Sequence, residues 1–282
     1  MSFNIYEEVT ARIISELEKG VIPWEKPWTG TKDGAISYST GKPYSLINQM
    51  LLGDPGEYIT FSQCKAKGGK VRAGAKSKMV VFWKMVPVKD ETAENGERLV
   101  PMLRYYNVFH LSDCEGVTSR LCDEKPAADP QRDETAETVI ADYLTRSGVK
   151  LSHLAQDKAY YNPIKDAIVV PLLEQFPKQS EYYSTVFHEL AHSTGHASRL
   201  NRIKATAFSS DTEYSKEELV AEISAAACCT RLHLETPSSF KNSAAYIQSW
   251  LRALRNDNKL IVSAAGRAEK ATRMIFNETI SA

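Results

Sequence analysis

The pentapeptide His188-Glu189-Leu190-Ala191-His192 constrains this 282-residue chain more than any other segment, because it has the form HExxH. On a helix, residues four positions apart lie on the same face one turn apart, so both imidazoles can point at a common centre. Nitrogen–zinc distances of ~2.0–2.1 Å are compatible with that arrangement. The pattern predicts a helix over residues 180–195 that binds one zinc ion, with Glu189 as general base toward an attacking water.

The surrounding residues favour a metal site over a chance match to this short pattern. Tyr182, Tyr183 and Val186 give the helix an apolar side, as a buried active-site helix requires. Gly195 stands where such a helix has to end. A further helix, predicted over residues 216–232, combines acidic with small residues and follows at a suitable distance.

That further helix supplies the candidates for the remaining ligand. A catalytic zinc site has three protein ligands and an open position. Glu218 follows His192 by 26 residues, which suits a helix–loop–helix return, so we predict Glu218 as the third ligand. Glu222 is one turn further and is predicted to accept a hydrogen bond from a ligand imidazole. A solvated helix face is the alternative for both residues.

The remaining histidines and paired cysteines carry weaker signals. A third histidine in the metzincin pattern would fall at position 198, which is Ser198, so that pattern is excluded. His196 is expected to be structural, and His153 and His233 are expected to pack or lie on the surface. Cys228-Cys229 follows an alanine run and is expected to fill a small space in the core.

Composition excludes several classes of protein. Hydrophobic residues make up 43% and charged residues 25% of the chain, values of a soluble globular protein. No apolar run approaches the ~20 residues that span a bilayer, so no membrane partner is expected. Five cysteines without a CxxC pair give no disulfide framework. A cytoplasmic location is the simplest expectation.

Charge is segregated along the chain although its net value is zero. Residues 58–89 hold eight Lys or Arg residues and no Asp or Glu, whereas residues 123–137 hold six acidic and two basic residues. The acidic segment contains two prolines and little to bury, which indicates a linker. We therefore predict domains at residues 1–122 and 137–282, joined by an acidic linker at 123–136.

Periodicity and turn residues predict an α+β fold. Helices are expected at residues 3–19, at 46–52, shortly before Gly68, at 138–147, and twice beyond residue 232. Strands are expected at residues 79–87, 100–111, 158–161 and 167–171. The last two of these are either an edge that pairs with an extended substrate, with a tyrosine facing the metal, or an ordinary hairpin.

The first half combines basic and aromatic residues in the way that single-stranded nucleic acid requires. Cations follow phosphates, and bases stack on aromatic faces with ~1–3 kcal/mol per base. The alternative is a solvated basic surface beside core aromatics. The candidate DNA contacts are Lys65, Lys67, Lys70, Arg72, Lys76, Lys78, Trp83, Arg104 and Tyr106.

Both halves together resemble the ArdC antirestriction proteins of mobile elements. The first half carries Pro23-Trp24-x-Lys26-Pro27-Trp28, Gly41-Lys42-Pro43-Tyr44, Gly68-Gly69-x-Val71-Arg72-x-Gly74, Val81-Phe82-Trp83-Lys84 and Arg104-Tyr105-Tyr106-x-Val108-Phe109. The second half carries Tyr161-x-Pro163-x-x-Asp166-x-Ile168, the HExxH segment through His196, Ser198-Arg199-Leu200-Asn201-Arg202 and Glu217-Glu218-Leu219-Val220-Ala221-Glu222.

The resemblance implies an N-terminal α+β domain that binds single-stranded DNA, with a small sheet, and a C-terminal zincin-like, gluzincin-type metallopeptidase domain. It also implies protection of incoming DNA from restriction during conjugative transfer. The expected partners are single-stranded DNA and a protein or peptide substrate. Two other functions were weighed. One is a non-catalytic protein that coats single strands and has a structural zinc site. The other is a nuclease or primase, which the imidazole-based site disfavours.

Overall fold

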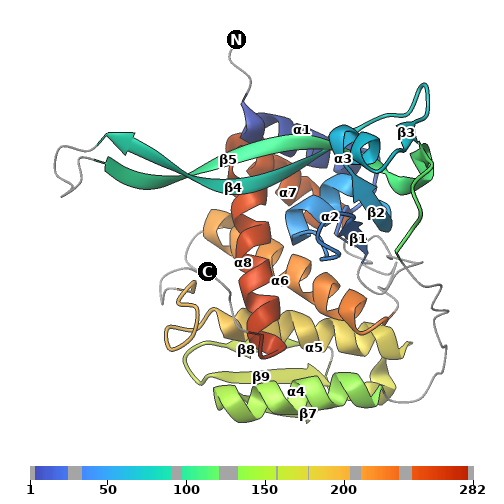
Figure 1. Cartoon of the computed structure of the whole chain (residues 1–282). Helices are drawn as coiled ribbons and strands as arrows, with labels where there is room; N and C mark the ends of the chain where they lie inside the picture. Colours follow the sequence, from blue (N-terminus) through green and yellow to red (C-terminus); the bar gives the residue numbers. More distant parts are fainter. Residues whose placement is uncertain are drawn as a thin grey trace.

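The computed structural model describes residues 4–24, 34–89, 97–120, 133–156, 158–176, 178–203, 211–234 and 243–278. We call residues 4–120 the N-terminal part and residues 133–278 the C-terminal part. Figure 1 shows the two parts stacked at opposite ends of the molecule, with the long helix α8 (Leu260–Ile275) running from one to the other.

The N-terminal part combines three helices with a four-stranded sheet in the order β1-β2-β5-β4. The strands of this sheet are β1 (Ala35–Ser37), β2 (Gly56–Ile59), β4 (Lys78–Lys89) and β5 (Glu97–His110). A second pair, β3 (Lys70–Val71) and β6 (Cys114–Glu115), lies beside the 3-10 turn η1 (Leu111–Asp113). The helices are α1 (Ile5–Glu18), α2 (Leu46–Leu52) and α3 (Phe61–Ala66).

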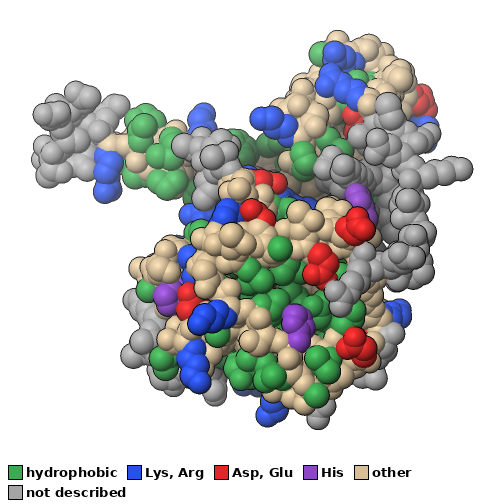
Figure 2. Space-filling view, turned by 90° about the horizontal axis from the view of Figure 1, so that it is seen from below, with side chains coloured by type: hydrophobic (Ala, Val, Ile, Leu, Met, Phe, Trp, Pro, Cys, Tyr) green, Lys and Arg blue, Asp and Glu red, His purple; other side chains and the backbone are tan. Residues whose placement is uncertain are grey.

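Strands β4 and β5 form an antiparallel hairpin whose outer half projects from the body of the protein (Figures 1 and 2). Its register pairs Lys78 with Val108 at the base and Lys89 with Glu97 at the outer end. Large apolar side chains on this arm are exposed to solvent. They are Phe82, Trp83, Met85, Leu99, Met102, Tyr105 and Tyr106.

Two buried amides on α2 connect that helix to the sheet. Asn48 donates to the carbonyl oxygen of Val81 at 2.8 Å and accepts from its amide at 2.7 Å. Gln49 makes the same double contact with the backbone of Ala35. The two side chains satisfy backbone groups on β4 and β1 as a neighbouring strand would, so α2 is fixed against both.

The C-terminal part consists of a three-stranded sheet and five helices. The sheet has the order β7-β9-β8, with β7 (Lys150–Leu154) parallel and β8 (Tyr160–Asn162) antiparallel to β9 (Ala167–Pro171). The 3-10 turn η2 (Leu173–Gln175) follows. The helices are α4 (Glu134–Ser147), α5 (Gln179–Thr194), α6 (Asp211–Arg231), α7 (Ser243–Asn256) and α8.

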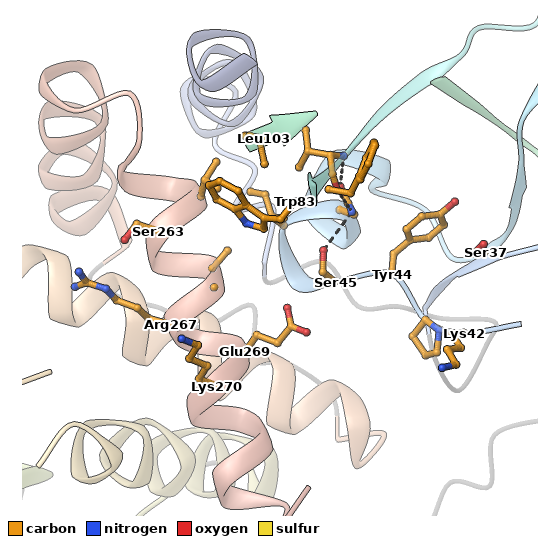
Figure 3. A pocket seen from close by; sticks show the side chains of 18 of the residues that line it. Ser37, Lys42, Tyr44, Ser45, Trp83, Leu103, Ser263, Arg267, Glu269 and Lys270 are labelled. Carbon is orange, nitrogen blue, oxygen red and sulfur yellow. Dashed lines mark hydrogen bonds between the residues drawn. The ribbon is translucent and has the colours of Figure 1, made fainter. Parts of the chain in front are cut away.

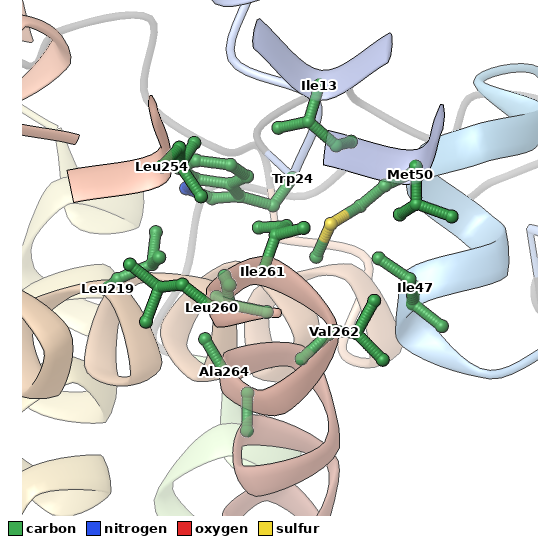
Figure 4. Close-up of a cluster of buried hydrophobic side chains, with 14 of the residues drawn as sticks. Ile13, Trp24, Ile47, Met50, Leu219, Leu254, Leu260, Ile261, Val262 and Ala264 are labelled. Atoms are coloured by element: carbon green, nitrogen blue, oxygen red, sulfur yellow. The ribbon is translucent and has the colours of Figure 1, made fainter. Parts of the chain in front are cut away.

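One hydrophobic core crosses the boundary between the two parts. It joins Ile13 of α1 and Met50 of α2 to Leu219 of α6, Leu254 of α7 and Ile261 of α8 (Figure 4). The sequence explains the α8 contribution, because this helix carries alanines and aliphatic residues on its inner side and accepts close neighbours there. The two parts are therefore held in a fixed relation by apolar packing.

Most predicted elements agree with the structure. Helix α2 and strand β9 have the predicted bounds, and α1, α5, α6 and the β4–β5 strands agree within a few residues. The short strands β1, β2, β3, β6 and β7 were not predicted. Helix α4 begins at Glu134, so the end of the predicted linker is helical and Ala136 is buried in the core. Residues 123–132 of that linker lie outside the described residues, and the domain bounds stay a prediction.

Four of the cysteines lie within the described residues. Cys64, Cys114, Cys228 and Cys229 are free and buried, and the last two pack in the core as predicted. Within the described ranges, no helix is both long and apolar enough to cross a bilayer.

Replacing Ile13 tests the shared core. Ile13→Ala removes a side chain that is 1% exposed and should lower the free energy of unfolding by ~2–5 kcal/mol. Because the same core contains α6, α7 and α8, we expect one cooperative thermal transition at a lower midpoint. Ser15→Ala, on the exposed side of α1, should change the free energy by less than ~0.5 kcal/mol. Separate transitions of the two parts would contradict a shared core.

Candidate metal centre

Helices α5 and α6 pack against each other and form the centre of the site. On α5, Val186, Phe187 and Leu190 are fully buried in the core that also contains strand β9. The HExxH histidines lie on a different side of the same helix, where α6 meets it. The helical spacing alone therefore places the core-packing residues on one side of α5 and the two histidines on another.

The three predicted ligands converge between these helices. Nitrogen atoms from His188 and His192 and a carboxylate oxygen of Glu218 lie within 4.8 Å of one another. The two Nε2 atoms are 3.0 Å apart. Glu218 places one oxygen 3.6 Å from Nε2 of His188 and the other 3.3 Å from Nε2 of His192. The Nε2 atoms and the carboxylate thus surround one point.

Each imidazole also has a carboxylate behind it. Nδ1 of His188 lies 3.6 Å from Glu222, and the predicted hydrogen bond between them stays a prediction. Nδ1 of His192 lies 3.5 Å from Glu217, which sequence reasoning did not select. Carboxylates in these positions fix the orientation of a ligand imidazole and raise its basicity.

Arg202 holds Glu217 in place. Its guanidinium pairs with Glu217 at 2.8 Å and donates to Oγ1 of Thr194 at 2.8 Å and to the carbonyl oxygen of Ala191 at 2.9 Å. This arginine therefore joins α5, α6 and the segment between them. The sequence displayed Arg202 only as part of a family pattern, and nothing in its spacing revealed this role.

Close packing at the end of α5 brings Arg202 into reach. Gly195 follows the helix, and a Cβ atom there would lie 2.8 Å from Cγ1 of Ile203. The amides of Arg202 and Ile203 both donate to the carbonyl oxygen of Gly195 at 2.9 Å. The glycine ends the helix as predicted, but the physical reason is the close return of this segment rather than a left-handed backbone.

The electrostatics of the pocket favour a cation. Although burial opposes ionisation, hydrogen bonds with His188 and His192 hold the pKa of Glu218 well below its usual value. Burial also opposes a charged His192, but Glu217 and Glu218 raise its pKa to about 10. For Glu222, burial raises the pKa to about 7 despite the nearby imidazoles. Carboxylates are in excess here, and added positive charge stabilises them.

The residues fit a divalent metal ion. Two imidazole nitrogens and one carboxylate oxygen are the donor set of gluzincin-type catalytic sites, which leave one position open. Nδ1 of His192 is buried and makes no hydrogen bond, although Glu217 lies just beyond bonding distance. A small movement on metal binding would close that gap. Glu189 is 6% exposed and lies on α5 beside the three ligands.

The other histidines lie outside this cluster. Nδ1 of His196 accepts from the amide of Ser198 at 3.2 Å, and the ring caps the turn after α5. His153 on β7 lies 2.8 Å from the hydroxyl of Tyr182. On β8, Tyr161 donates to Asp166 at 2.7 Å and is buried, whereas Tyr160 is exposed. The hydroxyl of Tyr161 thus stabilises the turn between β8 and β9 through Asp166 instead of facing the ligands.

The predicted DNA contacts separate into two groups. Lys65, Lys67, Lys70 and Lys76 are exposed on and after α3, and Arg72 lies 3.4 Å from Glu115. Lys78 is bound to Asp54 at 2.6 Å and to the carbonyl oxygen of Leu52, so its charge is already compensated. The second group, Trp83, Arg104 and Tyr106, lies on the β4–β5 hairpin.

The hairpin register places that second group on two faces. Trp83 is opposite Leu103, whereas Tyr106 is opposite Val80 and Arg104 is opposite Phe82. Side chains at paired positions share a face, and neighbouring positions alternate. Tyr106, Phe82 and Arg104 therefore lie on one face, and Trp83 lies on the other with Tyr6 of α1, at a ring distance of 6.5 Å. Phe82, which was not predicted, lies 5.5 Å from Tyr106.

An HExxH helix that meets a glutamate from the next helix, beside a small sheet with an antiparallel edge strand, defines a zincin-like protein. Residues 135–267 match a family model described as a zincin-like metallopeptidase. Residues 3–109 match the N-terminal domain of the anti-restriction factor ArdC. The chain belongs to the ArdC antirestriction family, and the predicted α+β, two-domain fold is confirmed.

Solved structures support the same assignment over the whole chain. The crystal structure of the antirestriction protein ArdC from plasmid R388, in its Mn(II)-bound form, is 34% identical, covers 98% of both chains and has a TM-score of 0.78. Its metal-free structure gives a TM-score of 0.77. The Mn(II)-bound relative and the clustered ligand atoms support a divalent cation in this chain, while zinc itself stays a prediction.

Two further relatives place the chain in a wider context. The protein y4eC of Sinorhizobium fredii is 31% identical over 95% of this chain and 90% of its own length. DNA primase TraC of Escherichia coli is 34% identical over 94% of this chain. The chain spans only 19% of that primase and 26% of a second TraC protein, so the similarity concerns one segment of each.

Metal affinity tests the role of Glu217. Glu217→Gln removes the negative charge behind His192 and leaves Arg202 without its partner, so affinity for Mn(II) or zinc should fall ~10–100-fold. Calorimetric titration of the metal-depleted protein measures this. Glu213→Gln, an exposed position on the same helix, should leave the affinity unchanged. An unaltered affinity in Glu217→Gln would show that this carboxylate does not support the ligand.

Proposed function

We propose that this protein is a metallopeptidase that binds single-stranded DNA and acts in antirestriction. The observation that carries the proposal is the convergence of His188, His192 and Glu218, with Glu189 buried beside them. The same chain presents aromatic and basic side chains on the β4–β5 hairpin, whose base packs into the hydrophobic core that also contains α6. A peptide-cutting site and a nucleic-acid surface on one rigid body support cleavage of a protein near DNA.

The chemistry follows from the residues. A divalent cation held by His188, His192 and Glu218 would supply Lewis-acid polarisation of a peptide carbonyl. Glu189 would take a proton from the attacking water at its carboxylate and return it to the leaving amine. Glu217 and Glu222 would hold the two imidazoles in the orientation that binds the cation.

Strand β8 gives a place for an extended peptide. In the described sheet it pairs only with β9, and its other edge is available for backbone hydrogen bonds. It contacts α5, the helix that carries the histidines. A peptide added along this edge would lie beside the ligands, with main-chain bonds providing affinity. This supports a peptide as the second partner.

The N-terminal part supports a single-stranded nucleic acid as the first partner. Phe82 and Tyr106 expose 40% and 37% of their surface on one face of the hairpin, beside Arg104. Exposed rings next to cations bind bases and phosphates of a single strand, whose bases are not already stacked in a duplex. A role in antirestriction comes from the relative, whose name as an antirestriction protein we extend to this chain.

A hydrolytic role makes a definite prediction for Glu189. Glu189→Gln keeps the size of the side chain but removes the base, so peptide hydrolysis should fall by at least ~100-fold while metal affinity stays within a few-fold. Hydrolysis of a denatured protein and metal titration measure the two properties.

Glu181→Gln, on the first turn of the same helix, serves as the control and should hydrolyse at the wild-type rate. If Glu189→Gln hydrolyses as well as the wild type, the peptidase assignment is wrong. Unchanged antirestriction in cells that carry Glu189→Gln would favour the other function weighed above, a non-catalytic coat on single strands.

The basic segment after α3 gives a second prediction. Lys70→Ala with Arg72→Ala removes two cations, so binding of a single-stranded oligonucleotide should weaken at low salt. The slope of log affinity against log salt should fall in magnitude by about 1.4. Exchanging the two residues, Lys70→Arg with Arg72→Lys, preserves the charge and should preserve affinity. An unchanged slope in the alanine variant would place the strand elsewhere.

A further inference from the structure

A cleft of about 850 Å³ lies between the N-terminal part and α8. One wall comes from the segment Ser37–Asn48, a second from the base of the β4–β5 hairpin, and the third from α8. Figure 3 shows Trp83 near the top of the cleft, Arg267, Glu269 and Lys270 close together on α8, and Tyr44 and Lys42 on another wall. None of the α8 residues was predicted from the sequence to contact DNA.

The cleft is cationic. Four cations line it, Lys42, Arg267, Lys270 and Arg273, together with the single carboxylate of Glu269. Arg273 pairs with Glu269 at 2.8 Å. Within the described part of the chain, Lys42, Arg267 and Lys270 form no ion pair and are exposed. Their charges are therefore available to an anionic ligand.

The cations of α8 form a row. Arg267, Lys270 and Arg273 are three positions apart, so they lie near one side of the helix over ~9 Å at ~1.5 Å per residue. Phosphates along one strand of B-form DNA are ~3.4 Å apart along the axis, so this row can contact more than one of them. A compact anion would occupy only part of it.

The wall formed by the hairpin is aromatic. Phe82 and Tyr106 are 40% and 37% exposed on one face of the hairpin, and Trp83 is 55% exposed on the other. All three line the cleft, as does Tyr44. Cations on one wall and ring faces on another match a chain that has charge along its backbone and flat bases to the side. An acidic peptide would use the cations but would leave these rings without a stacking partner.

The walls are held in a fixed relation by the shared core. Ile47, Val81, Leu103 and Ala265 contribute to the cleft lining and belong to that core. Residues 3–109 match the ArdC N-terminal domain, and the zincin-like match ends at Arg267, so Lys270 and Arg273 lie beyond both. The cationic side of α8 therefore extends from the last matched residue, Arg267, into the segment beyond both matches.

We propose that this cleft binds single-stranded nucleic acid, with phosphates on Arg267 and Lys270 of α8 and bases against Phe82 and Tyr106. This inference rests on the proposed single-strand binding and assigns its location. A strand bound here contacts both parts of the protein, which positions DNA against the body that carries the metal site. The basic segment after α3 then adds salt-dependent contacts outside the cleft.

Fluorescence anisotropy with a labelled oligothymidine of about 12 nucleotides tests the location. Arg267→Ala with Lys270→Ala should weaken binding at least tenfold at about 50 mM salt and lower the magnitude of the salt slope by about 1.4. Both side chains are exposed and unpaired, so the thermal midpoint should not change. The matched control, Lys150→Ala with Lys165→Ala, removes the same charge from the far sheet and should bind as the wild type does.

Two further readouts separate stacking from charge. Phe82→Ala should weaken binding roughly 5- to 150-fold without changing the salt slope. In a Trp28→Phe background, used because Trp28 lies outside the described residues, oligonucleotide binding should quench the emission of Trp83. Trp83→Phe in that background should lose this quenching, because Trp24 and Trp250 are buried.

Each result has one meaning. If the wild type binds the oligonucleotide but the α8 variant keeps its affinity and slope, the cleft is not the site and only this inference is overturned. If the wild type does not bind, the proposed DNA function fails together with the inference. If polyglutamate of equal charge competes equally well and Phe82→Ala affects neither ligand, the cleft takes acidic peptides and the inference is wrong.

Discussion

The structure depends most on the contact between α5 and α6, where two imidazoles meet an excess of buried carboxylates. Glu189, Glu217, Glu218 and Glu222 are between 4% and 8% exposed, and burying such groups is costly unless positive charge compensates them. The protein supplies part of that charge through Arg202, which pairs with Glu217. A divalent cation bound between His188, His192 and Glu218 would supply the rest. Metal binding at this candidate site would then also favour the packing of these two helices.

The second constraint is the core that joins the two parts of the chain. Apolar residues of α1 and α2 pack on α6, α7 and α8, and the inner side of α8 is buried along its length. A change at the N-terminal helix therefore acts on the helices around the metal centre. The same packing forms the cleft between the hairpin and α8, so the proposed strand-binding cleft and the candidate metal centre belong to one rigid body.

Much of this could be predicted from the sequence, because the signals were local. Helical spacing brings His188 and His192 to one face, and the interval from His192 to Glu218 allows one helix to return to another. Runs rich in Val, Phe, Tyr and Trp indicated the two strands of the hairpin. The features that the sequence did not predict depend on contacts between distant segments. Glu217 looked like any helical glutamate, and its place behind His192 requires the exact rotation of α6. Arg202 belongs to no periodic pattern in the sequence. Strands β1 and β7 are short and lack a clear alternation of apolar and polar residues, so neither the strands nor their pairing partners could be predicted.

The sequence by itself determined which groups are brought together locally: two imidazoles one helical turn apart, a glutamate next to the first of them, and a basic, aromatic first half. These follow from residue type and from the geometry of a single helix or strand. Only the tertiary structure decided which carboxylate supports which imidazole, that Trp83 and Tyr106 lie on opposite faces of the hairpin, and that α8 lines a cationic cleft. Such facts depend on how distant segments pack, and packing is set by the combined shape of many side chains rather than by any local pattern.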